Sequence, residues 1–330
     1  MTKKIILSGM RPTGKLHLGH MVGVLNNWTA LQEKYNCFFM VADWHALMSE
    51  YENPHDIKKN TYEVVKDWIA CGIDPERSVI FIQSMVPEHL ELAMVFSLLT
   101  PLGWLERCTT YKEQLRELKG RMLATYAFLG YPVLQTADIA LYNSESVPVG
   151  VDQLPHLELA REIIRKFNKL YGKDVFKEPE PLLTKASKLV GIDNRKMSKS
   201  YDNTIDLADP SEVVKKKVFS MYTDPNRVRA DVPGKVEGNP VFIYHDLFNP
   251  NKKEVDDLKE RYRQGKVGDV EVKTKLAAAL NNYLDPIRQR RNKLPEDKVH
   301  DVVKKGADRA REVAKKTMVK VKKCLHQVID

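Results

Sequence analysis

The segment KIILSGMRPTGKLHLGH (residues 4–20) joins an apolar run to a polar turn and two histidines. The run at 4–9 has the length and the β-branched content of a buried strand. A basic, glycine-containing turn follows it, and His17 and His20 stand three residues apart around Gly19. Such polarity at the end of a buried strand suits a metal site, a phosphate site or an ordinary polar loop, and the segment by itself leaves all three open.

The residues that follow repeat this alternation of strand and helix patterns. Buried strands are predicted at CFFMVAD (37–43) and SVIFIQS (78–84), and helices with apolar residues near 3.6 spacing at 21–35 and 54–72. The order β-α-β-α-β implies a parallel sheet with right-handed crossovers. We therefore predict an α/β fold whose catalytic domain is a Rossmann-like, doubly wound parallel sheet, joined to a smaller α-helical domain.

The strand pattern ends near residue 200. From 201 onward the sequence is mostly helical in pattern, with proline and glycine breaks at 226–241 and 245–253. We predict three parts, namely a catalytic domain at 1–200, a helical domain at 201–288, and a basic C-terminal helix at 289–330 that packs back on the catalytic domain.

The bulk composition is that of a water-soluble enzyme. Of 330 residues, 43% are hydrophobic and 29% are charged, which suffices for a sizeable core. No apolar run approaches the ~18 residues that cross a bilayer, and the first apolar stretch is too short for a signal peptide. We predict a cytoplasmic protein that does not bind membranes. The cysteines, which form no close pair and so disfavour disulfides and zinc ribbons, are Cys37, Cys71, Cys108 and Cys324.

The positive charge is concentrated at the end of the chain. The formal net charge is +9, and residues 288–330 contain fourteen Lys and Arg against six Asp and Glu. Such a surplus is typical of a surface that meets a polyanion. A solvated basic helix face explains the charge equally well.

Phosphate chemistry suits the histidine pair better than metal binding. The pair has no thiol or carboxylate partners at the spacing of a zinc site. The turn at 13–14 and the helix that opens near Leu18 expose backbone N–H groups and the positive end of a helix dipole. Gly19 allows a nucleotide to approach the backbone, and His17 and His20 can donate hydrogen bonds to phosphate oxygens.

A second motif, RKMSKS at 195–200, strengthens the phosphate interpretation. Lys196 and Lys199 stand among small hydroxyl residues. Two flexible ammonium groups suit a pyrophosphate leaving group, on which charge builds up in the transition state. A charged run is more often a solvated loop, but HxGH followed about 180 residues later by KMSKS is far more specific than either motif alone.

These motifs, in this order, are signatures of a known family. The chain resembles the class I aminoacyl-tRNA synthetases, and more closely the bacterial tryptophanyl-tRNA synthetases, over essentially its whole length. The segments that carry the resemblance are SGMRPTGKLHLGH (8–20), VADWHAL (41–47), GIDPERSVIFIQS (72–84), LERCTTYKE (105–113), YPVLQTADIALYNSESVPVGVDQLPHLELAREI (131–163), RKMSKSYDN (195–203) and TDPNRVR (223–229).

The resemblance implies a two-step reaction with L-tryptophan, Mg-ATP and tRNA(Trp). The tryptophan carboxylate would attack the α-phosphate to give tryptophanyl-adenylate and pyrophosphate, and the acyl group would then move to the 2′-OH of the 3′-terminal ribose. Catalysis of this kind rests mainly on positioning and electrostatics. The resemblance also implies a homodimer whose tRNA spans both subunits, with the helical domain on the anticodon side.

The resemblance also implies a tryptophan pocket. Asp138 would accept the indole N–H, a contact that rejects apolar amino acids because a buried carboxylate without its donor is costly. Tyr131 and Gln153 would hold the α-ammonium group. Gln135 stands where some relatives have a methionine against the ring, and it could line the pocket or bond to Asp138. Without the resemblance, Asp138 would be interpreted as a helix-surface acid. The implied set is Leu7, His45, Tyr131, Gln135, Asp138 and Gln153.

The ATP site follows from the same resemblance. The two histidines of HLGH and the two lysines of KMSKS would stabilise phosphate charge. Gly150 and Asp152 would face the ribose and adenine, and Mg²⁺ would arrive with ATP. Some relatives hold an iron–sulfur cluster through cysteines in the helical domain, but 261–273 has none, so we predict neither a cluster nor a bound structural metal. The catalytic residues would be His17, His20, Lys196 and Lys199, and the ATP-binding residues Arg11, Thr13, Gly19, His20, Gly150, Asp152, Lys196, Met197, Ser198 and Lys199.

Three alternatives remain open on the sequence alone. A tyrosyl-tRNA synthetase is the nearest, because an aspartate can equally accept a phenol O–H. A small-molecule nucleotidyltransferase also uses HxGH, although it needs neither KMSKS nor a basic tail. A non-catalytic RNA-binding paralogue could keep the fold, although it would have no need of four phosphate-directed groups.

Overall fold

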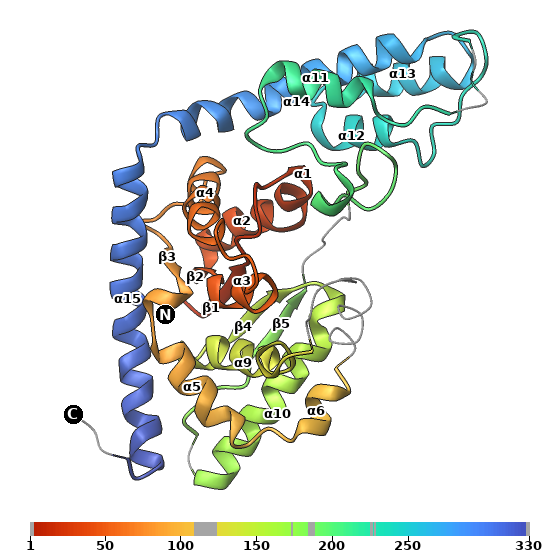
Figure 1. The fold of residues 1–330 in the computed structure, drawn as a ribbon. Helices are drawn as coiled ribbons and strands as arrows, with labels where there is room; N and C mark the ends of the chain where they lie inside the picture. Colours follow the sequence, from red (N-terminus) through yellow and green to blue (C-terminus); the bar gives the residue numbers. More distant parts are fainter. Residues whose placement is uncertain are drawn as a thin grey trace. The chain divides into compact units, whose positions relative to one another are not determined.

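Five parallel strands form the sheet around which the first part of the chain is built (Figure 1). The computed structural model describes residues 3–108, 124–172, 174–183, 189–224, 227 and 229–327. The strands are β1 (Ile5–Met10), β2 (Asn36–Val41), β3 (Val79–Ile82), β4 (Ser146–Val149) and β5 (Glu180–Leu183). Their order is β3-β2-β1-β4-β5 and each neighbouring pair is parallel. The predicted Rossmann-like α/β class is confirmed.

The pairing of the strands explains why the polar segments that follow β1, β2 and β3 lie close together. Nearly every side chain of β2 and β3 is buried, as parallel strands covered on both faces require. Met10 pairs with Val41, and Val41 pairs with Ile82. The segments after these three strands therefore begin at one level, at the carboxyl edge where α/β folds bind ligands.

The helices of the first 172 residues match the predicted pattern in part. The helix predicted over 21–35 is divided into α1 (Leu18–His20), a π-helical turn η1 (Met21–Leu25) and α2 (Asn26–Lys34), and the one predicted over 54–72 is α4 (Ile57–Ala70). The short helix α3 (Asp43–Glu50) follows β2 directly, and neither it nor the helices after α4 up to residue 172 had a predicted range. The other elements are η2 (Gln83–Met85), α5 (Glu88–Ser97), α6 (Leu102–Glu106), α8 (Tyr126–Leu129), α9 (Tyr131–Leu141), η3 (Val151–Gln153) and α10 (Leu154–Tyr171).

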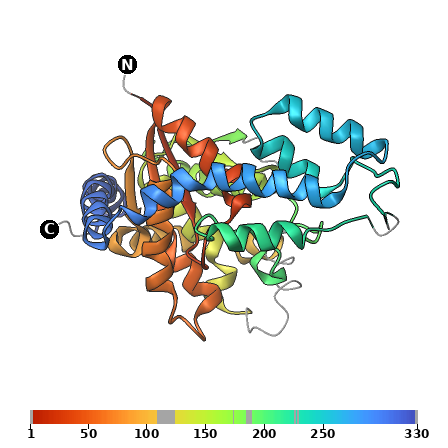
Figure 2. The same ribbon diagram turned by 90° about the horizontal axis from the view of Figure 1, so that it is seen from above.

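The C-terminal helix α15 (Glu296–Cys324) packs on β3 and α5 (Figures 1 and 2). It approaches β3 closely because Gly306 has no side chain, since an added Cβ would lie 1.8 Å from the carbonyl oxygen of Ile80. Arg311 Nε donates to Glu88 Oε1 across 2.9 Å. Part of the basic surplus of the tail is therefore used to attach the helix to the sheet unit.

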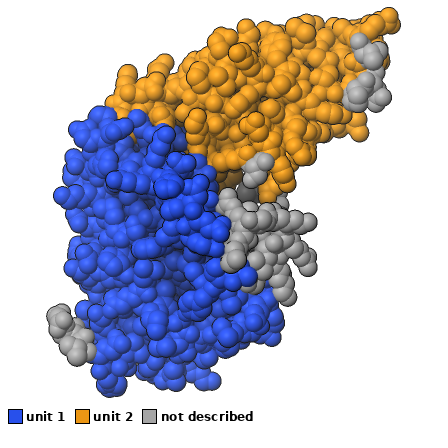
Figure 3. Space-filling model, viewed as in Figure 1, with its two compact units in different colours: residues 1–14, 27–185, 295–330 blue, residues 15–26, 186–294 orange. Residues whose placement is uncertain are grey.

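The chain divides into two compact units, which are residues 1–14, 27–185 and 295–330, and residues 15–26 and 186–294 (Figure 3). These boundaries differ from the predicted ones at 200 and 288. The reason is main-chain pairing, because Leu18 N donates to Ile205 O and Leu207 N donates to Leu16 O, both across 2.9 Å. The second unit contains η4 (Lys199–Tyr201), α11 (Ser211–Phe219), α12 (Pro240–Phe248), α13 (Lys252–Arg263) and α14 (Asp269–Asn292). No helix in the described part of the chain combines the length and the apolar character that a membrane span needs.

Candidate active site

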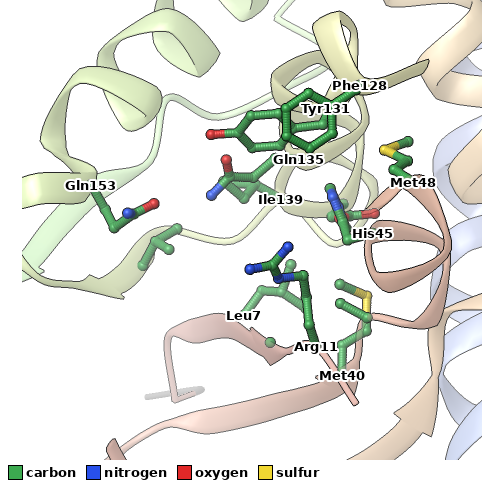
Figure 4. Close-up of a pocket in the computed structure, with 14 residues that line it drawn as sticks. Leu7, Arg11, Met40, His45, Met48, Phe128, Tyr131, Gln135, Ile139 and Gln153 are labelled. Carbon is green, nitrogen blue, oxygen red and sulfur yellow. The ribbon is translucent and has the colours of Figure 1, made fainter. Parts of the chain in front are cut away.

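A cavity of about 270 Å³ opens at the carboxyl edge of β1 and β2 in the first unit (Figure 4). It collects all six residues of the implied tryptophan pocket, although they come from four separate segments of the chain. Apolar side chains supply most of the remaining wall, as is usual for a small-molecule site with a few convergent polar groups. The lining residues are Leu7, Gly9, Arg11, Met40, Ala42, His45, Met48, Phe128, Tyr131, Gln135, Asp138, Ile139, Val147 and Gln153.

Asp138 is the buried acid of this cavity, with 2% of its surface exposed. Its Oδ2 lies 2.8 Å from His45 Nε2, and its Oδ1 lies 2.6 Å from His89 Nδ1 and accepts from Gln83 Nε2 across 2.8 Å. Burial alone would raise the pKa of this carboxyl, but the charges and hydrogen bonds of His89 and His45 outweigh burial and lower it to about 2. Asp138 is therefore an ionised acceptor at neutral pH.

The hydrogen bonds to Asp138 leave room for one further donor. A carboxylate offers about four acceptor positions, two on each oxygen. Among the described residues, two donors use Oδ1 and one uses Oδ2. Because Asp138 lines the cavity, the remaining position on Oδ2 suits one N–H or O–H of a ligand ring.

The other polar wall is organised by a histidine that the sequence did not single out. His156 Nδ1 lies 2.8 Å from the hydroxyl of Tyr131 and 3.1 Å from Gln135 Oε1. Of the two roles considered for Gln135, the side chain thus lines the pocket and bonds to His156. Burial lowers the pKa of His156 to about 4, so the ring is neutral at pH 7 and does not repel a bound ammonium group.

Three of the implied ATP-binding residues surround the cavity or its rim. Arg11 lines the cavity itself, and burial lowers its pKa while Glu50 raises it. Gly150 precedes η3, and an added Cβ there would lie 2.7 Å from Asp152 Oδ1. Asp152 Oδ2 accepts from Gln153 Nε2 across 3.0 Å, which joins an implied ATP residue to an implied amino-acid residue.

Thr13 belongs to the turn that follows β1. Its N–H donates to the carbonyl of Arg11 across 2.9 Å. The next residue, Gly14, has φ of +120°, a backbone conformation that favours glycine. The turn after β1 therefore has one defined backbone conformation, which would hold its N–H groups in place for a phosphate.

The second unit brings the two signature motifs together. Residue 17 bridges to residue 206 in antiparallel fashion, next to the hydrogen bond between Leu18 and Ile205. Gly19 lies between the motifs, because an added Cβ would be 2.9 Å from His17 Nδ1 and 3.2 Å from Met197 Sδ. HLGH and KMSKS, almost 180 residues apart in sequence, are therefore packed against each other.

Both imidazoles of HLGH are neutral at pH 7. Burial and then the charge of Lys199 lower the pKa of His17 to about 4. Burial, His17 and Lys199 together hold the pKa of His20 well below its usual value. His20 Nδ1 accepts the backbone N–H of His17 across 3.2 Å, so the neutral ring carries its proton on Nε2. His20 is then a hydrogen-bond donor that adds no charge to the site.

Asn203 supports the backbone of the KMSKS loop. Its Oδ1 accepts from Ser198 N across 2.8 Å, and its Nδ2 donates to Lys196 O across 3.1 Å and to Asp193 Oδ1 across 2.7 Å. The side chain is 1% exposed. One buried amide thus fixes the residues on either side of Met197.

Sequence reasoning missed four supporting residues. A buried histidine or amide gives no local pattern, and the partners of these residues lie far away in the chain. Three of the four do fall within segments that carried the resemblance, at 72–84, 131–163 and 195–203, without being given a role. The four are Gln83, His89, His156 and Asn203.

The sheet, the HxGH pair and the KMSKS loop together define a class I aminoacyl-tRNA synthetase. The chain belongs to the family of tRNA synthetases class I (W and Y), whose family model matches residues 2–285. The tryptophan–tRNA ligases of Thermotoga maritima and Treponema pallidum are each 48% identical to it, over 97% of this chain and 98% and 96% of the relative. The crystal structure of tryptophanyl-tRNA synthetase from Campylobacter jejuni complexed with ADP and tryptophan has a TM-score of 0.89 at 33% identity, covering 98% of this chain and 99% of that one.

Proposed function

We propose that the protein is a tryptophan–tRNA ligase of the bacterial type. The observation that carries this proposal is the single acceptor position left on Asp138, inside a cavity that also has large apolar walls. An indole offers one ring N–H and a large apolar surface, which match that position and the walls of Leu7, Met40 and Ile139. The 48% identity to a tryptophan–tRNA ligase over 97% of this chain supports the same substrate.

The first step forms the adenylate. A tryptophan carboxylate oxygen attacks the α-phosphorus of ATP, the bond to the bridging oxygen breaks, and pyrophosphate leaves with its electrons. Neutral His17 and His20 donate to the phosphate oxygens, and Lys196 and Lys199 offset the charge that grows on pyrophosphate. The chain supplies positioning and charge, and none of its side chains has to form a covalent bond.

The second step transfers the amino acid to tRNA(Trp). A hydroxyl of the 3′-terminal ribose attacks the carbonyl carbon of the adenylate, and the bond from that carbon to the phosphate oxygen breaks. An ester bond to tRNA forms, and AMP leaves with the electron pair of the broken bond as the hydroxyl proton is released. The α-ammonium group stays with Tyr131 and Gln153, beside the neutral His156. ATP brings Mg²⁺ as part of the substrate, and we propose that the protein uses neither an iron–sulfur cluster nor structural zinc.

The basic tail would contact the phosphate backbone of tRNA. Lysines at 298, 304, 305, 315 and 320 are exposed on α15, while Arg311 is paired with Glu88. Exposed lysines that meet a polyanion release its counterions and give salt-dependent binding. We further propose a cytoplasmic enzyme, in keeping with a tRNA substrate.

A second copy of the chain would cover the exposed face of α5. Leu90 and Met94 on this helix and Leu98 directly after it are spaced four residues apart and are 40%, 61% and 69% exposed, so they form one apolar stripe. An exposed stripe of large apolar side chains favours a protein partner. We propose a homodimer through this face, which sedimentation of the wild type and of a Met94→Lys variant would test.

Amino-acid-dependent ATP–pyrophosphate exchange tests the proposed function. The full-length protein is assayed with each of the twenty amino acids. We expect tryptophan alone to drive exchange. Exchange with tyrosine would identify a tyrosyl-tRNA synthetase, and a lack of exchange with every amino acid would favour a nucleotidyltransferase or a non-catalytic RNA-binding protein.

A further inference from the structure

His89 lies behind the amino-acid cavity and does not line it. It is the second residue of α5, and its side chain is 0% exposed. Its Nδ1 is 2.6 Å from Asp138 Oδ1, and its Nε2 is 2.8 Å from the hydroxyl of Tyr142. One buried imidazole therefore connects the acid of the cavity to a buried phenol.

The spacing of its two partners explains this geometry. Asp138 and Tyr142 are four residues apart at the end of α9, so they lie on the same helix face. Tyr142 is held between aromatic rings, with centroids 4.8 Å from Phe38 and 5.6 Å from Phe81. The phenol is thus fixed by packing, and the imidazole is fixed by the phenol.

The chemistry of the three groups determines that His89 donates its hydrogen bond to Asp138. An ionised carboxylate can only accept, so the imidazole proton toward Asp138 stands on Nδ1. Burial, with Asp138 and Glu88, raises the pKa of Tyr142 well above its usual value, so the phenol keeps its proton. His89 Nε2 and the phenol oxygen share one hydrogen bond of 2.8 Å, and this contact fixes the ring with its Nδ1 proton directed at Asp138.

We propose that His89, held by Tyr142, is a positioning residue that determines specificity for the ring N–H of the amino acid. It fixes Oδ1 of Asp138, so that Oδ2 presents its one remaining acceptor position to the cavity. This inference rests on the proposed function, because it assumes that Asp138 receives the indole N–H.

The loss of the hydrogen bond from His89 would leave the carboxylate of Asp138 in the cavity but less firmly oriented. The carboxylate would retain Gln83 and His45 as donors, but its terminal torsion is broad and would be held less firmly. A hydrogen bond to a charged group is worth about ten- to a hundredfold in affinity. A misplaced Oδ2 would lower the affinity for ligands that carry the ring N–H by part of that factor. It would not change the affinity for ligands that lack the N–H.

The test compares L-tryptophan with its benzothiophene analogue, in which sulfur replaces the ring N–H. Dissociation constants of both ligands are measured by calorimetry on the full-length protein, and the ratio of the two gives the preference for the N–H. The variants are Tyr142→Phe, His89→Gln and His89→Asn. Asparagine places an N–H near the position of Nδ1, whereas glutamine places its amide near Nε2. Tyr262→Phe is the matched control, because Tyr262 is another buried phenol, with its hydroxyl on Asp269 at 2.9 Å in the helical unit.

We expect the preference for tryptophan to fall about threefold in Tyr142→Phe and about tenfold in His89→Gln, because in each the donor to Asp138 is weakened or lost. His89→Asn should restore most of the preference, and Tyr262→Phe should leave it unchanged. The affinity for the sulfur analogue should stay within about twofold throughout. KM for tryptophan in pyrophosphate exchange should rise with little change in kcat, since the weakened contact to the ring N–H is made equally in the ground state and the transition state.

Two results would overturn the role of His89. In one, the variants weaken both ligands by the same factor, as a loss of packing alone would do. In the second result, the preference for tryptophan over the sulfur analogue is unchanged in Tyr142→Phe and in His89→Gln. If His89→Gln does not fold, Tyr142→Phe alone decides this outcome. A wild type that binds the two ligands equally, or that does not bind tryptophan, would instead overturn the proposed function, and with it this inference.

Discussion

The backbone N–H of Leu18 donates to the carbonyl of Ile205 across 2.9 Å. This hydrogen bond joins the histidine motif near the start of the chain to the segment after the lysine motif. Its neighbour Gly19 fits between His17 and Met197 with no space for a methyl group. A change at this contact should therefore disturb both motifs of the proposed phosphate site.

Gly19→Ala should reduce adenylate formation. A Cβ at 2.9 Å from His17 Nδ1 must displace the imidazole or Met197, and small displacements of catalytic groups are costly. We expect kcat for pyrophosphate exchange to fall about tenfold or more, with tryptophan affinity within about twofold of wild type. The control is Gly23→Ala, since a Cβ at Gly23 meets nothing within 4 Å. Equal kcat values for the two variants would contradict this view of Gly19.

Lys199→Ala should lower kcat and leave tryptophan binding unchanged. The ammonium group is assigned to charge that appears on pyrophosphate only as the reaction proceeds, and the loss of one such group costs about a hundredfold or more. Single-turnover adenylate formation and tryptophan calorimetry measure the two quantities. Lys216→Ala, on the exposed face of α11, controls for the loss of one positive charge. If Lys199→Ala exchanges pyrophosphate at the wild-type rate, the assignment is wrong.

The stability of the first unit should fall in acid because of Asp138. The pKa of this carboxyl is about 2 in the folded chain, against an ordinary value of 3.8, so the folded state favours the ionised form. This stabilisation is present above pH 3.8 and is lost as the pH falls toward 2, with a total of about 2 kcal/mol. Urea unfolding of the wild type and of Asp138→Asn at about pH 5 and about pH 2.5 measures the effect. The difference in stability between the two proteins should shrink by about two thirds of that amount, and a constant difference would refute the prediction.

Gly306→Ala should detach α15 from β3. Alanine usually stabilises a helix interior by up to about 1 kcal/mol relative to glycine, but here its Cβ would lie 1.8 Å from Ile80 O. Overpacking of this kind costs about 1–3 kcal/mol, so we expect a lower free energy of unfolding. Gly103→Ala, where nothing lies within 4 Å of an added Cβ, should leave stability unchanged or slightly raised. A stabilised Gly306→Ala protein would show that this close approach is absent.

The basic tail should set the salt dependence of tRNA binding. Lys304 and Lys305 are exposed on α15. If both neutralise phosphates, changing both to glutamine should reduce the slope of log K against log salt by about 1.8. The double change to arginine keeps the charge and should keep the slope. An unchanged slope in the glutamine protein would place the tRNA contacts elsewhere.

The sequence predicted the elements whose patterns are local. The apolar runs at 4–9, 37–43 and 78–84 became β1, β2 and β3, and α4 lies inside the helix predicted at 54–72. The short helix α3 was missed because DWHALMSE (43–50) has only two turns, too few to establish a helical period. The π-helical turn after His20 was missed because such turns leave no propensity signal.

The candidate site was predictable only where motifs supplied it. HLGH, KMSKS and YPVLQTADI identified the residues that would meet ligands, and the structure places the six amino-acid residues around one cavity. The residues that hold them in place escaped prediction. His89 is 49 positions from Asp138, and His156 is 25 from Tyr131, and no periodicity links partners at such separations.

The pairing of residues 16–18 with 205–207 has a consequence for how the enzyme is made. The histidine motif is among the first segments to leave the ribosome, whereas the segment that pairs with it is synthesised nearly 190 residues later. At about 5–20 residues per second, the two are separated by roughly 10–40 s of translation. During that interval the nascent chain would carry only half of the proposed nucleotide site, so the onset of ATP binding would mark the moment at which residue 207 becomes free to fold.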